Sequence, residues 1–236
     1  MNAKIVLVRP LYEENVGYIA RLAANFECRE IALVKPECNW KSGLAKSRAM
    51  HGKHLLLKAK KFDSLEKALE DCAYSAATTA LLGKGKKLNR NSISAKELGK
   101  RFAKSKGMLG LVFGSEPNGL LNEEIEKCDF VVSIEASRKY KTLNIGHAAA
   151  VLLHELFNAK KGGKGIEGEA KASEKRLLER KFKQVLESLP GIDNRKAVFA
   201  SFRALLSRSL LTGKEAKSLV AFLGEAGKGL GKGKRN

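Results

Sequence analysis

Cysteine is scarce in this sequence, and long apolar runs are absent from it. The four cysteines lie far apart and form no Cys-x-x-Cys pair; they are Cys28, Cys38, Cys72 and Cys128. This usage indicates neither a disulfide framework nor a zinc site, so we expect a reducing, cytoplasmic location and no bound metal. No apolar stretch reaches the roughly 18 residues of a membrane span, and the short run at residues 5–8 lacks the length and cleavage site of a signal peptide. We therefore expect no membrane partner.

Acidic residues are also scarce. The 236 residues include 25 acidic and 45 basic side chains, which gives a formal net charge of +20. Residues 1–159 contribute +9 and the much shorter segment 160–236 contributes +11. An excess of this size attracts polyanions and speeds their encounter, although it also fits a device for solubility.

Two segments concentrate the positive charge. Residues 41–61 contain seven Lys or Arg and no acid, and residues 84–106 contain nine against one acid. Each segment also fits a solvated helix face, which is the usual origin of a charge run. Together with the basic C-terminal part of the chain, they favour a nucleic-acid partner.

Five short apolar runs alternate with segments of helical spacing. The runs, rich in Val, Ile, Leu and Ala, cover residues 5–8, 30–35, 73–80, 109–114 and 129–135. Between them, apolar residues recur every three or four positions, as at Ile19, Leu22 and Phe26. Strands that are apolar on both faces and alternate with helices are typical of a parallel α/β sheet. We expect the run after Gly146 to be the last helix of this domain, packed on the sheet.

The rest of the chain predicts a second, smaller domain. From the pattern we expect a first domain over residues 1–158, a linker over 159–173, a helical domain over 174–226 and an unfolded basic tail over 227–236. The linker contains the spacing GxGxxG, but no strand precedes it, so it predicts no dinucleotide site.

Three helices are expected in the second domain. Ser173 is a plausible N-cap for the first, which ends at Pro190-Gly191. The second runs through residues 198–206. The third begins near Thr212, where Glu215 three positions later completes a capping box.

Three polar motifs carry chemical information. In the first, residues 9–26, we expect Asn15 and Gly17 in a loop and Arg21 about one turn into the following helix. Arg21 lies off the apolar face set by Ile19 and Leu22, so it points to solvent or to a site. A single exposed arginine by itself indicates no function.

The second motif, LVFGSEPNGL at residues 111–120, is a strand that runs into a sharp turn. Ligands of open α/β sheets bind at the carboxyl ends of the strands. Gly114 and Gly119 let a ligand approach the backbone, and Glu116 supplies a hydrogen-bond acceptor. The same composition is common in turns without a ligand.

The third motif, Thr142 to Gly146, precedes the alanine-rich helix. Thr142 offers a hydroxyl and Asn144 an amide with two donors and one acceptor. Free N–H groups at the helix start are able to receive a carboxylate or the acceptor atoms of adenine. Ordinary helix capping explains the stretch equally well.

The order and spacing of these motifs resemble the three motifs of the SPOUT RNA ribose 2′-O-methyltransferases. The matching residues are Asn15-x-Gly17-x3-Arg21, Phe113-Gly114-Ser115-Glu116-x2-Gly119-Leu120 and Thr142-Leu143-Asn144. Residues 77–80 resemble the threonine-containing strand end of the TrmJ branch of that family. Residues 203–209, with Glu215, resemble the helical C-terminal domain of the same branch, so the resemblance covers almost the whole chain.

The resemblance implies a fold, a cofactor and an assembly. The fold is an α/β SPOUT domain with a parallel sheet and a deep trefoil knot made from residues around 109–150, followed by a small all-helical domain. The cofactor is S-adenosyl-L-methionine, and the assembly is a homodimer in which Arg21 of one subunit faces the cofactor bound by the other. The implied cofactor-binding residues are Thr78, Thr79, Ala80, Gly114, Ile134, Thr142, Leu143 and Asn144. The implied catalytic residues are Arg21, Asn15, Glu116, Thr142 and Asn144.

The resemblance also implies a role for each catalytic residue. Arg21 orients the ribose hydroxyl or the adjacent phosphate and stabilises developing negative charge, Asn15 holds the Arg21 segment, and Glu116 and Asn144 position loops and substrate. The chain departs from the family pattern at Thr142, where Ser is usual, and in a short segment before Asn15. We expect both departures to bear on nucleoside preference rather than on reaction type.

The implied activity is methylation of tRNA at the ribose of nucleotide 32 in the anticodon loop, with cytidine and uridine as candidate nucleosides. A ribosomal RNA substrate is the close alternative. A catalytically silent RNA-binding protein is an alternative of another class, and the joint presence of Asn15, Arg21, Glu116 and Asn144 argues against it. A nicotinamide oxidoreductase is the least supported, because no glycine fingerprint follows a strand.

Overall fold

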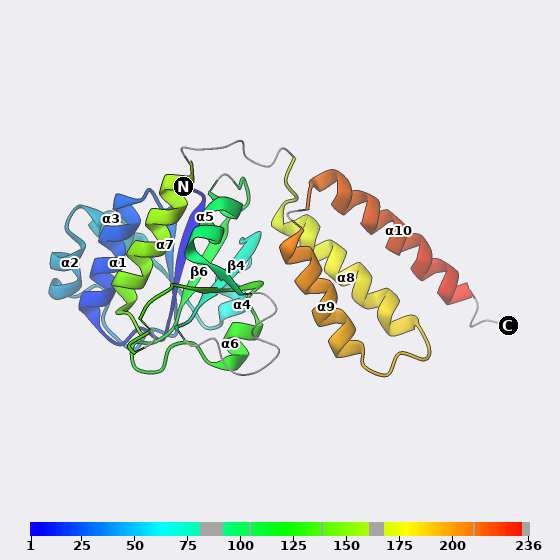
Figure 1. The fold of residues 1–236 in the computed structure, drawn as a ribbon, viewed down its shortest axis with the longest axis horizontal. Coiled ribbons are helices and arrows are strands. Elements are labelled where there is room, and N and C mark those ends of the chain that lie inside the picture. Colours follow the sequence, from blue (N-terminus) through cyan, green and yellow to red (C-terminus); the bar gives the residue numbers. More distant parts are fainter. Residues whose placement is uncertain (81–91, 104, 138, 161–167, 210, 233–236) are drawn as a thin grey trace. The chain divides into compact units, whose positions relative to one another are not determined.

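The computed structural model describes residues 1–80, 92–103, 105–137, 139–160, 168–209 and 211–232. The chain divides into two compact units, Met1–Gly165 and Ile166–Asn236 (Figure 1). No helix among the described residues is long and apolar enough to span a membrane.

The first unit is built on a seven-stranded sheet in which every pairing is parallel. The strand order is β3-β2-β1-β6-β4-β7-β5. The strands are β1 (Ala3–Val8), β2 (Glu30–Val34), β3 (Lys60–Phe62), β4 (Tyr74–Thr78), β5 (Ser92–Ser94), β6 (Leu109–Phe113) and β7 (Phe130–Ser133). The parallel α/β fold and all five apolar strands expected from the sequence are confirmed. The sequence pattern missed β3 and β5, because these three-residue edge strands contain no apolar run.

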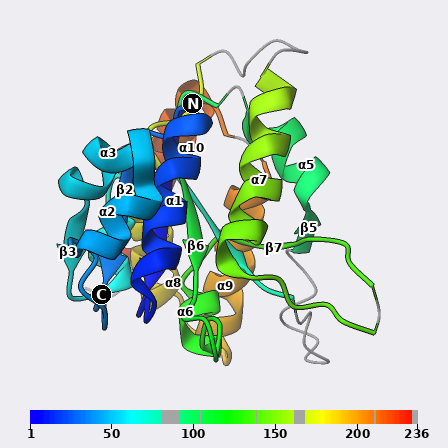
Figure 2. The ribbon, with the colours of Figure 1, turned by 90° about the vertical axis from the view of Figure 1, so that its left-hand side faces the viewer.

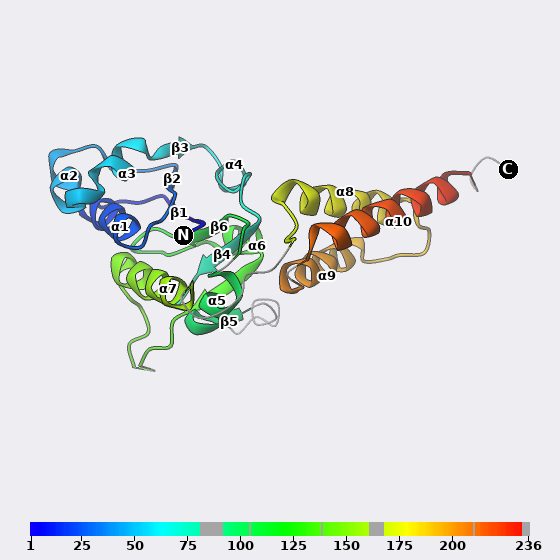
Figure 3. The ribbon, with the colours of Figure 1, turned by 90° about the horizontal axis from the view of Figure 1, so that it is seen from above.

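Helices cover both faces of the sheet (Figures 2 and 3). They are α1 (Glu13–Asn25), α2 (Gly43–Ala49), the 3₁₀ turn η1 (Met50–Gly52), α3 (Lys53–Lys58), α4 (Leu65–Ala68), α5 (Ala95–Phe102), α6 (Asn122–Glu126) and α7 (Ile145–Lys160). On one face α1, α7 and α5 pack side by side. On the other, Val6, Val8 and Val112 form a buried cluster with Leu65 and Ala68 of α4. Burial on both faces explains why the strands are continuous apolar runs.

The last two strands enter between earlier ones. β6 lies between β1 and β4, and β7 lies between β4 and β5. In a parallel sheet all carboxyl ends meet at one edge, so the segments that follow β1, β4, β6 and β7 converge there. These segments contain the three polar motifs.

The helix after β1 begins earlier than the sequence suggested. Asn15 and Gly17 were expected in a loop, but α1 starts at Glu13 and contains both residues, so Arg21 lies more than two turns from the start. Glu13 and Glu14 favour this start because their charges oppose the helix dipole. Gly17 is needed for packing: a Cβ atom there would lie 2.5 Å from the carbonyl oxygen of Ala45.

The second unit contains α8 (Ala172–Ser188), α9 (Arg195–Arg208) and α10 (Gly213–Lys232). Its core is formed by Leu178, Leu206, Leu211, Ala216 and Leu223 together with Ala170. The rings of Phe182 and Phe202 stack at a centroid distance of 3.7 Å. Each expected apolar stripe is only partly covered, and Val198, Leu205, Leu219 and Phe222 remain exposed.

Two of the expected helix boundaries are confirmed. α8 ends before Pro190, and α10 begins with the expected capping box, in which Thr212 Oγ1 accepts from the Glu215 N–H at 3.2 Å and the Glu215 carboxylate accepts from the Thr212 N–H at 2.8 Å. α8 begins at Ala172, so the expected cap Ser173 was wrong and lies inside the helix. The Glu174 carboxylate instead accepts from the N–H of Lys171 at 2.9 Å.

Two of the expected segments also differ in extent. Helix α10 continues to Lys232, so residues 227–232 are helical where the sequence suggested an unfolded tail. Gly227 packs against Val185 of α8, which explains how a glycine-rich segment stays helical: tertiary contacts override its poor propensity. The expected linker overlaps α7 and α8 at its ends, and residues 161–167 and 233–236 lie outside the described part of the chain.

Candidate functional site

Glu116 is the centre of a hydrogen-bond network at the carboxyl edge of the sheet. It follows β6, and its carboxylate accepts from the backbone N–H groups of Leu11 at 3.0 Å and Tyr12 at 3.3 Å. It also accepts from the Asn15 amide nitrogen at 3.0 Å. One side chain therefore fixes both the segment after β1 and the first turn of α1.

Asn15 extends this network to the third motif. Its amide oxygen accepts from Asn144 Nδ2 at 3.1 Å, and Asn144 Oδ1 accepts from the Gly146 N–H at 2.8 Å. The Asn144 side chain thus caps the start of α7, and its carbonyl accepts from the Ala148 N–H at 2.9 Å. Residues 15, 116 and 144, from three distant parts of the sequence, form one continuous chain of hydrogen bonds.

The turn after β6 favours glycine at two positions, at one for lack of space and at the other for its backbone conformation. A Cβ atom at Gly114 would lie 2.0 Å from the carbonyl carbon of Gly119, so the two arms of the turn touch. Gly119 adopts a φ of +64°, a left-handed conformation that disfavours other residues, and its N–H donates to the Ser115 carbonyl at 2.8 Å. The tight turn holds the Glu116 carboxylate against the segment that follows β1.

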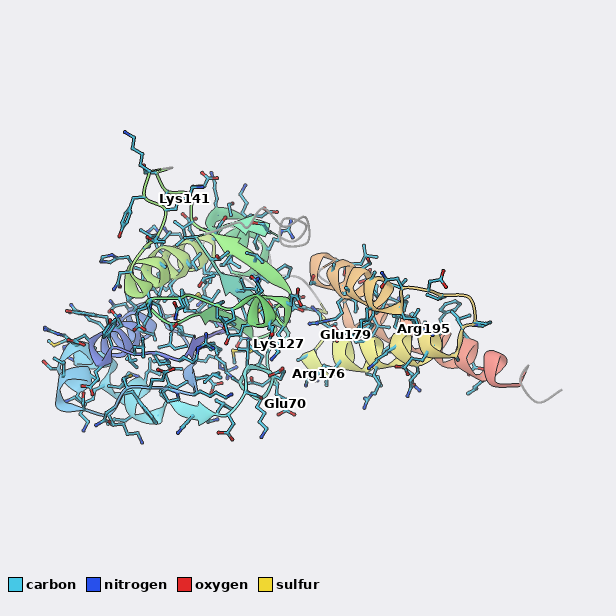
Figure 4. The ribbon with its side chains drawn as sticks, turned by 90° about the horizontal axis from the view of Figure 1, so that it is seen from below. Glu70, Lys127, Lys141, Arg176, Glu179 and Arg195 are labelled. Carbon is cyan, nitrogen blue, oxygen red and sulfur yellow. The ribbon has the colours of Figure 1, made fainter. Side chains whose placement is uncertain are left out.

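The remaining residues of the expected cofactor site lie along the same edge. Thr78 ends β4 opposite Val132 of β7, and the Thr79 N–H donates to the Val132 carbonyl at 3.2 Å. Residues 78–80 and Ile134, which follows β7 directly, are therefore neighbours, and all four are partly buried. Thr142 and Leu143 are exposed on the loop before α7, from which Lys141 also projects (Figure 4).

Backbone groups of this loop are free to bind a ligand. Within the described chain, neither Thr142 nor Leu143 makes a hydrogen bond. Leu143 is 41% exposed, so its apolar side chain is accessible to a ligand. Unpaired N–H and C=O groups next to exposed apolar surface suit a planar heterocycle, which needs both in-plane partners and apolar contact.

Arg21 does not join this network. Six residues of helix separate it from Asn15, which corresponds to about 9 Å along the axis and roughly 120° around it. Its side chain is exposed, as the sequence indicated, and it forms no hydrogen bond or ion pair with any described residue. A free guanidinium is a permanent cation that can bind a phosphate or a developing oxyanion.

The sequence pattern missed one ion pair that supports the site. Arg9, directly after β1, forms a bidentate pair with Glu124 of α6, with Nη2 at 3.1 Å from Oε2. Burial raises the pKa of the Glu124 carboxyl, but the hydrogen bonds from Arg9 and the Leu121 N–H outweigh it and hold that pKa below its ordinary value. In the sequence, only the position of Arg9 at the carboxyl end of a strand could have indicated this ion pair, because Glu124 lies 115 residues away.

Metal-ligand clusters are absent from the described residues, where no three His, Cys, Asp or Glu side chains gather. The site described above consists of neutral amides, one carboxylate, free backbone groups and a separate arginine. Groups of this kind are able to bind and orient a ligand by hydrogen bonds.

Comparison with known proteins agrees with the architecture and the motifs. The SpoU rRNA Methylase family matches residues 2–154 of the chain. The chain is 36% identical over 222 residues to the tRNA (cytidine-2′-O-)-methyltransferase TrmJ of Methanocaldococcus jannaschii, which covers 92% of this chain and 96% of that protein.

Solved structures share the fold. TrmJ from Z. mobilis ZM4 superposes with a TM-score of 0.72 at 23% identity, over 94% of this chain and 98% of that one. The SpoU methyltransferase AviRb of Streptomyces viridochromogenes, in complex with the cofactor AdoMet, superposes with a TM-score of 0.54 at 19% identity, over 68% and 61%. The family match over most of the chain, together with the archaeal relative, confirms the resemblance seen in the three motifs: the chain belongs to the SpoU rRNA methylase family.

Proposed function

We propose that the protein transfers a methyl group from S-adenosylmethionine to a ribose 2′-hydroxyl of tRNA. The observation that carries the proposal is the hydrogen-bond chain Glu116–Asn15–Asn144, which joins all three motifs at the carboxyl edge of the sheet. The substrate class rests on the similar M. jannaschii protein, whose name specifies a tRNA 2′-O-methyltransferase.

The residues at this edge fit the cofactor. Ile134 and the exposed Leu143 offer apolar contact for an adenine ring, and the free backbone groups of Thr142 and Leu143 offer hydrogen bonds to its edge. Thr78, Thr79, Ala80 and Gly114 line the neighbouring strand ends. When bound, S-adenosylmethionine supplies an electrophilic methyl group on a sulfonium.

The chain's own residues orient the second reactant. In the reaction the ribose 2′-oxygen would form a bond to the methyl carbon as the carbon–sulfur bond breaks, S-adenosylhomocysteine would leave, and the hydroxyl proton would pass to solvent. Arg21 binds the hydroxyl or the neighbouring phosphate and stabilises negative charge that develops on the oxygen. Asn15, Glu116 and Asn144 hold the loops in place, and the Thr142 hydroxyl faces the substrate.

The position of Arg21 supports a homodimer. Within one chain it points away from the Asn15–Asn144 network, so the site is incomplete without a second copy. Exposed apolar side chains that a partner would cover lie on α1 and α7: Tyr18 and Val151 are 41% and 38% exposed. In the dimer, Arg21 of the partner subunit completes each site.

Shared sites give a direct test of this assembly. Arg21→Ala and Asn144→Ala are each expected to abolish methyl transfer. Mixing the two after joint refolding restores activity, because heterodimers contain one site with both native residues. An inactive mixture in which heterodimers have been shown by native mass spectrometry places the whole site in one subunit and removes the dimer from the proposal.

The proposal extends to the knot, the target nucleotide and the second unit. Insertion of β6 and β7 between earlier strands supports a trefoil knot within residues 109–150. The second domain, expected over residues 174–226 after a linker, binds the RNA body, which its share of the positive charge supports. By family analogy the target is nucleotide 32 of the anticodon loop.

Methyl transfer from labelled S-adenosylmethionine to tRNA and ribosomal RNA transcripts tests the reaction and the substrate together. Mass spectrometry of nuclease fragments then locates the modified ribose. We expect one 2′-O-methyl group at nucleotide 32 of tRNA. Label in ribosomal RNA alone makes the ribosomal substrate the correct one, and label in neither transcript supports a silent RNA-binding protein.

A further inference from the structure

The surface formed by α2, η1 and α3 carries an uncompensated positive charge. Residues 38–62 contain no acid, and the side chains of Lys41, Arg48, Lys53, Lys58 and Lys61 are all exposed. Among the described residues, none of these five cations forms an ion pair. We call these five residues the cationic surface.

Three other exposed lysines of the same unit do have a carboxylate partner. Lys127 lies 2.7 Å from the Glu66 carboxylate, and Lys160 lies 3.4 Å from Glu27. Lys60, next to the cationic surface, pairs with Glu30 at 3.8 Å. An ion-paired lysine already has a local counter-charge, whereas an unpaired lysine is available to neutralise a phosphate and so to release cations condensed on the nucleic acid.

The cationic surface is fixed rigidly to the helix that carries Arg21. A Cβ atom at Gly17 would lie 2.5 Å from the Ala45 carbonyl oxygen, and one at Gly52 would lie 2.3 Å from the Ala20 carbonyl oxygen. These close approaches lock α2 and η1 onto α1, as Figure 2 shows. The Arg48 guanidinium also lies over the Tyr18 ring of α1, 5.7 Å from its centroid.

This packing places the backbone of Lys53 close to the segment of α1 that carries Arg21. Gly52 approaches the backbone nitrogen of Arg21, at 2.8 Å from an added Cβ, and Lys53 is the next residue along the chain. Lys53 and Lys58 then begin and end α3. Free cations therefore occur at both ends of α3, the helix that directly follows the Gly52 contact with α1.

We propose that the cationic surface binds the phosphates of the RNA strand that flanks the target nucleotide, and so presents the ribose to Arg21. This inference rests on the proposed function and assigns it a substrate-binding surface outside the C-terminal helices. Contacts of this kind position the RNA without reading its sequence.

The test compares two double variants that lose the same charge. In Lys53→Gln/Lys58→Gln two free cations of the cationic surface are removed, and in Lys127→Gln/Lys160→Gln two ion-paired lysines are removed. The affinity for a tRNA transcript is measured by fluorescence anisotropy between 50 and 300 mM KCl, roughly the range in which phosphate contacts are most evident. Affinity for S-adenosylhomocysteine, measured in parallel, shows that each variant is intact.

The first variant is expected to bind tRNA about tenfold more weakly at physiological salt, with the slope of log affinity against log salt reduced by about 1.5. The control variant keeps the wild-type slope. A wild-type slope for Lys53→Gln/Lys58→Gln, or an equal loss in both variants, overturns the inference while wild-type methyl transfer still supports the proposed function. If the wild-type protein neither binds nor methylates tRNA, the proposed function fails and the inference falls with it.

Discussion

The two edges of the sheet both carry polar networks, but they differ in where those networks end. At the amino edge, Lys4 of β1 is only 3% exposed, and its ammonium group contacts Asp71, the Glu30 carboxylate at 2.6 Å and the Ala68 carbonyl at 3.2 Å. Nearby, the Asp129 carboxylate accepts from both the N–H and the hydroxyl of Ser75 at 2.8 Å. Each of these groups is satisfied within the fold.

At the carboxyl edge the network stops at groups that have no partner. The chain from Glu116 through Asn15 to Asn144 ends beside the free backbone of Thr142 and Leu143. Polar groups that pair with one another stabilise a fold, and polar groups held in place but unpaired are available to a ligand. The contrast predicts that substitutions at the amino edge change stability, whereas those at the carboxyl edge change activity.

Arg21→Ala gives the largest expected effect, and we expect this effect on activity rather than on stability. We expect methyl transfer to fall by about 10²–10³-fold, the usual loss when one donor to a developing oxyanion is removed. Because the Arg21 side chain is exposed and forms no hydrogen bond or ion pair with any described residue, the melting temperature and the cofactor affinity are expected to stay at wild-type values. Single-turnover kinetics with Arg101→Ala, a helical arginine paired with Glu97, as the control measures this difference. Turnover at the wild-type rate removes Arg21 from the reaction.

Lys4→Ala is the counterpart at the amino edge. Removing the ammonium leaves two carboxylates without their partner, but these are 28% and 55% exposed. We therefore expect a loss of about 2 kcal/mol in the free energy of unfolding, below the roughly 3–5 kcal/mol of a fully buried pair. Urea unfolding tests this, with Lys60→Ala as the control because that exposed lysine pairs with the same Glu30. A drop in kcat of the folded enzyme would contradict the separation of the two edges.

Glu116→Gln sharpens the comparison within the carboxyl edge. The carboxylate accepts three hydrogen bonds, and a glutamine amide replaces one acceptor oxygen by a donor that faces other donors. Turnover is expected to fall about tenfold because Asn15 and the segment before it lose their anchor, a change of roughly 1.4 kcal/mol in the barrier. Steady-state kinetics of Glu66→Gln, an exposed carboxylate on the opposite face, provides the comparison. Equal effects of the two substitutions contradict the anchoring role of Glu116.

The smallest expected effect is the alkaline dependence of stability. Burial lowers the pKa of Lys4, but the hydrogen bonds to Asp71 and Glu30 outweigh it and raise that pKa above its ordinary value. A raised folded-state pKa means that the stabilisation is complete below about pH 10.4, the ordinary lysine value, and is lost as pH rises through the folded-state value. The Lys4→Met variant has no ammonium group at this position and therefore lacks this pH-dependent stabilisation. The difference in unfolding free energy between wild type and Lys4→Met is therefore expected to stay constant up to about pH 10 and to shrink above it, as pH rises through the raised folded-state pKa. A difference that stays constant above that pH refutes the assignment.

Periodicity was sufficient for the parts of the fold that bury apolar surface. The five apolar strands, the helix after Gly146 and the capping box at Thr212 follow from local patterns, because burial and capping depend on neighbours in the sequence. Edge strands β3 and β5 have no such pattern, and their pairing comes from the strands beside them. The helical end of α10 was misplaced for a related reason, since α10 packs against α8. The start of α1 was misplaced although Glu13 and Glu14 provide a local signal for it.

The amino-acid sequence by itself determined which residues are available for chemistry: three motifs in a fixed order, a parallel α/β pattern and a large positive charge. Only the tertiary structure decided which of them act together. It joined Asn15, Glu116 and Asn144 through hydrogen bonds that span more than 100 residues of chain, left Arg21 and the cationic surface without partners, and paired Lys4 and Arg9 with distant carboxylates. The physical reason is the sequence distance over which each effect acts. Local propensity depends on a few neighbouring residues, whereas these hydrogen bonds and ion pairs form where the strand order brings distant segments together.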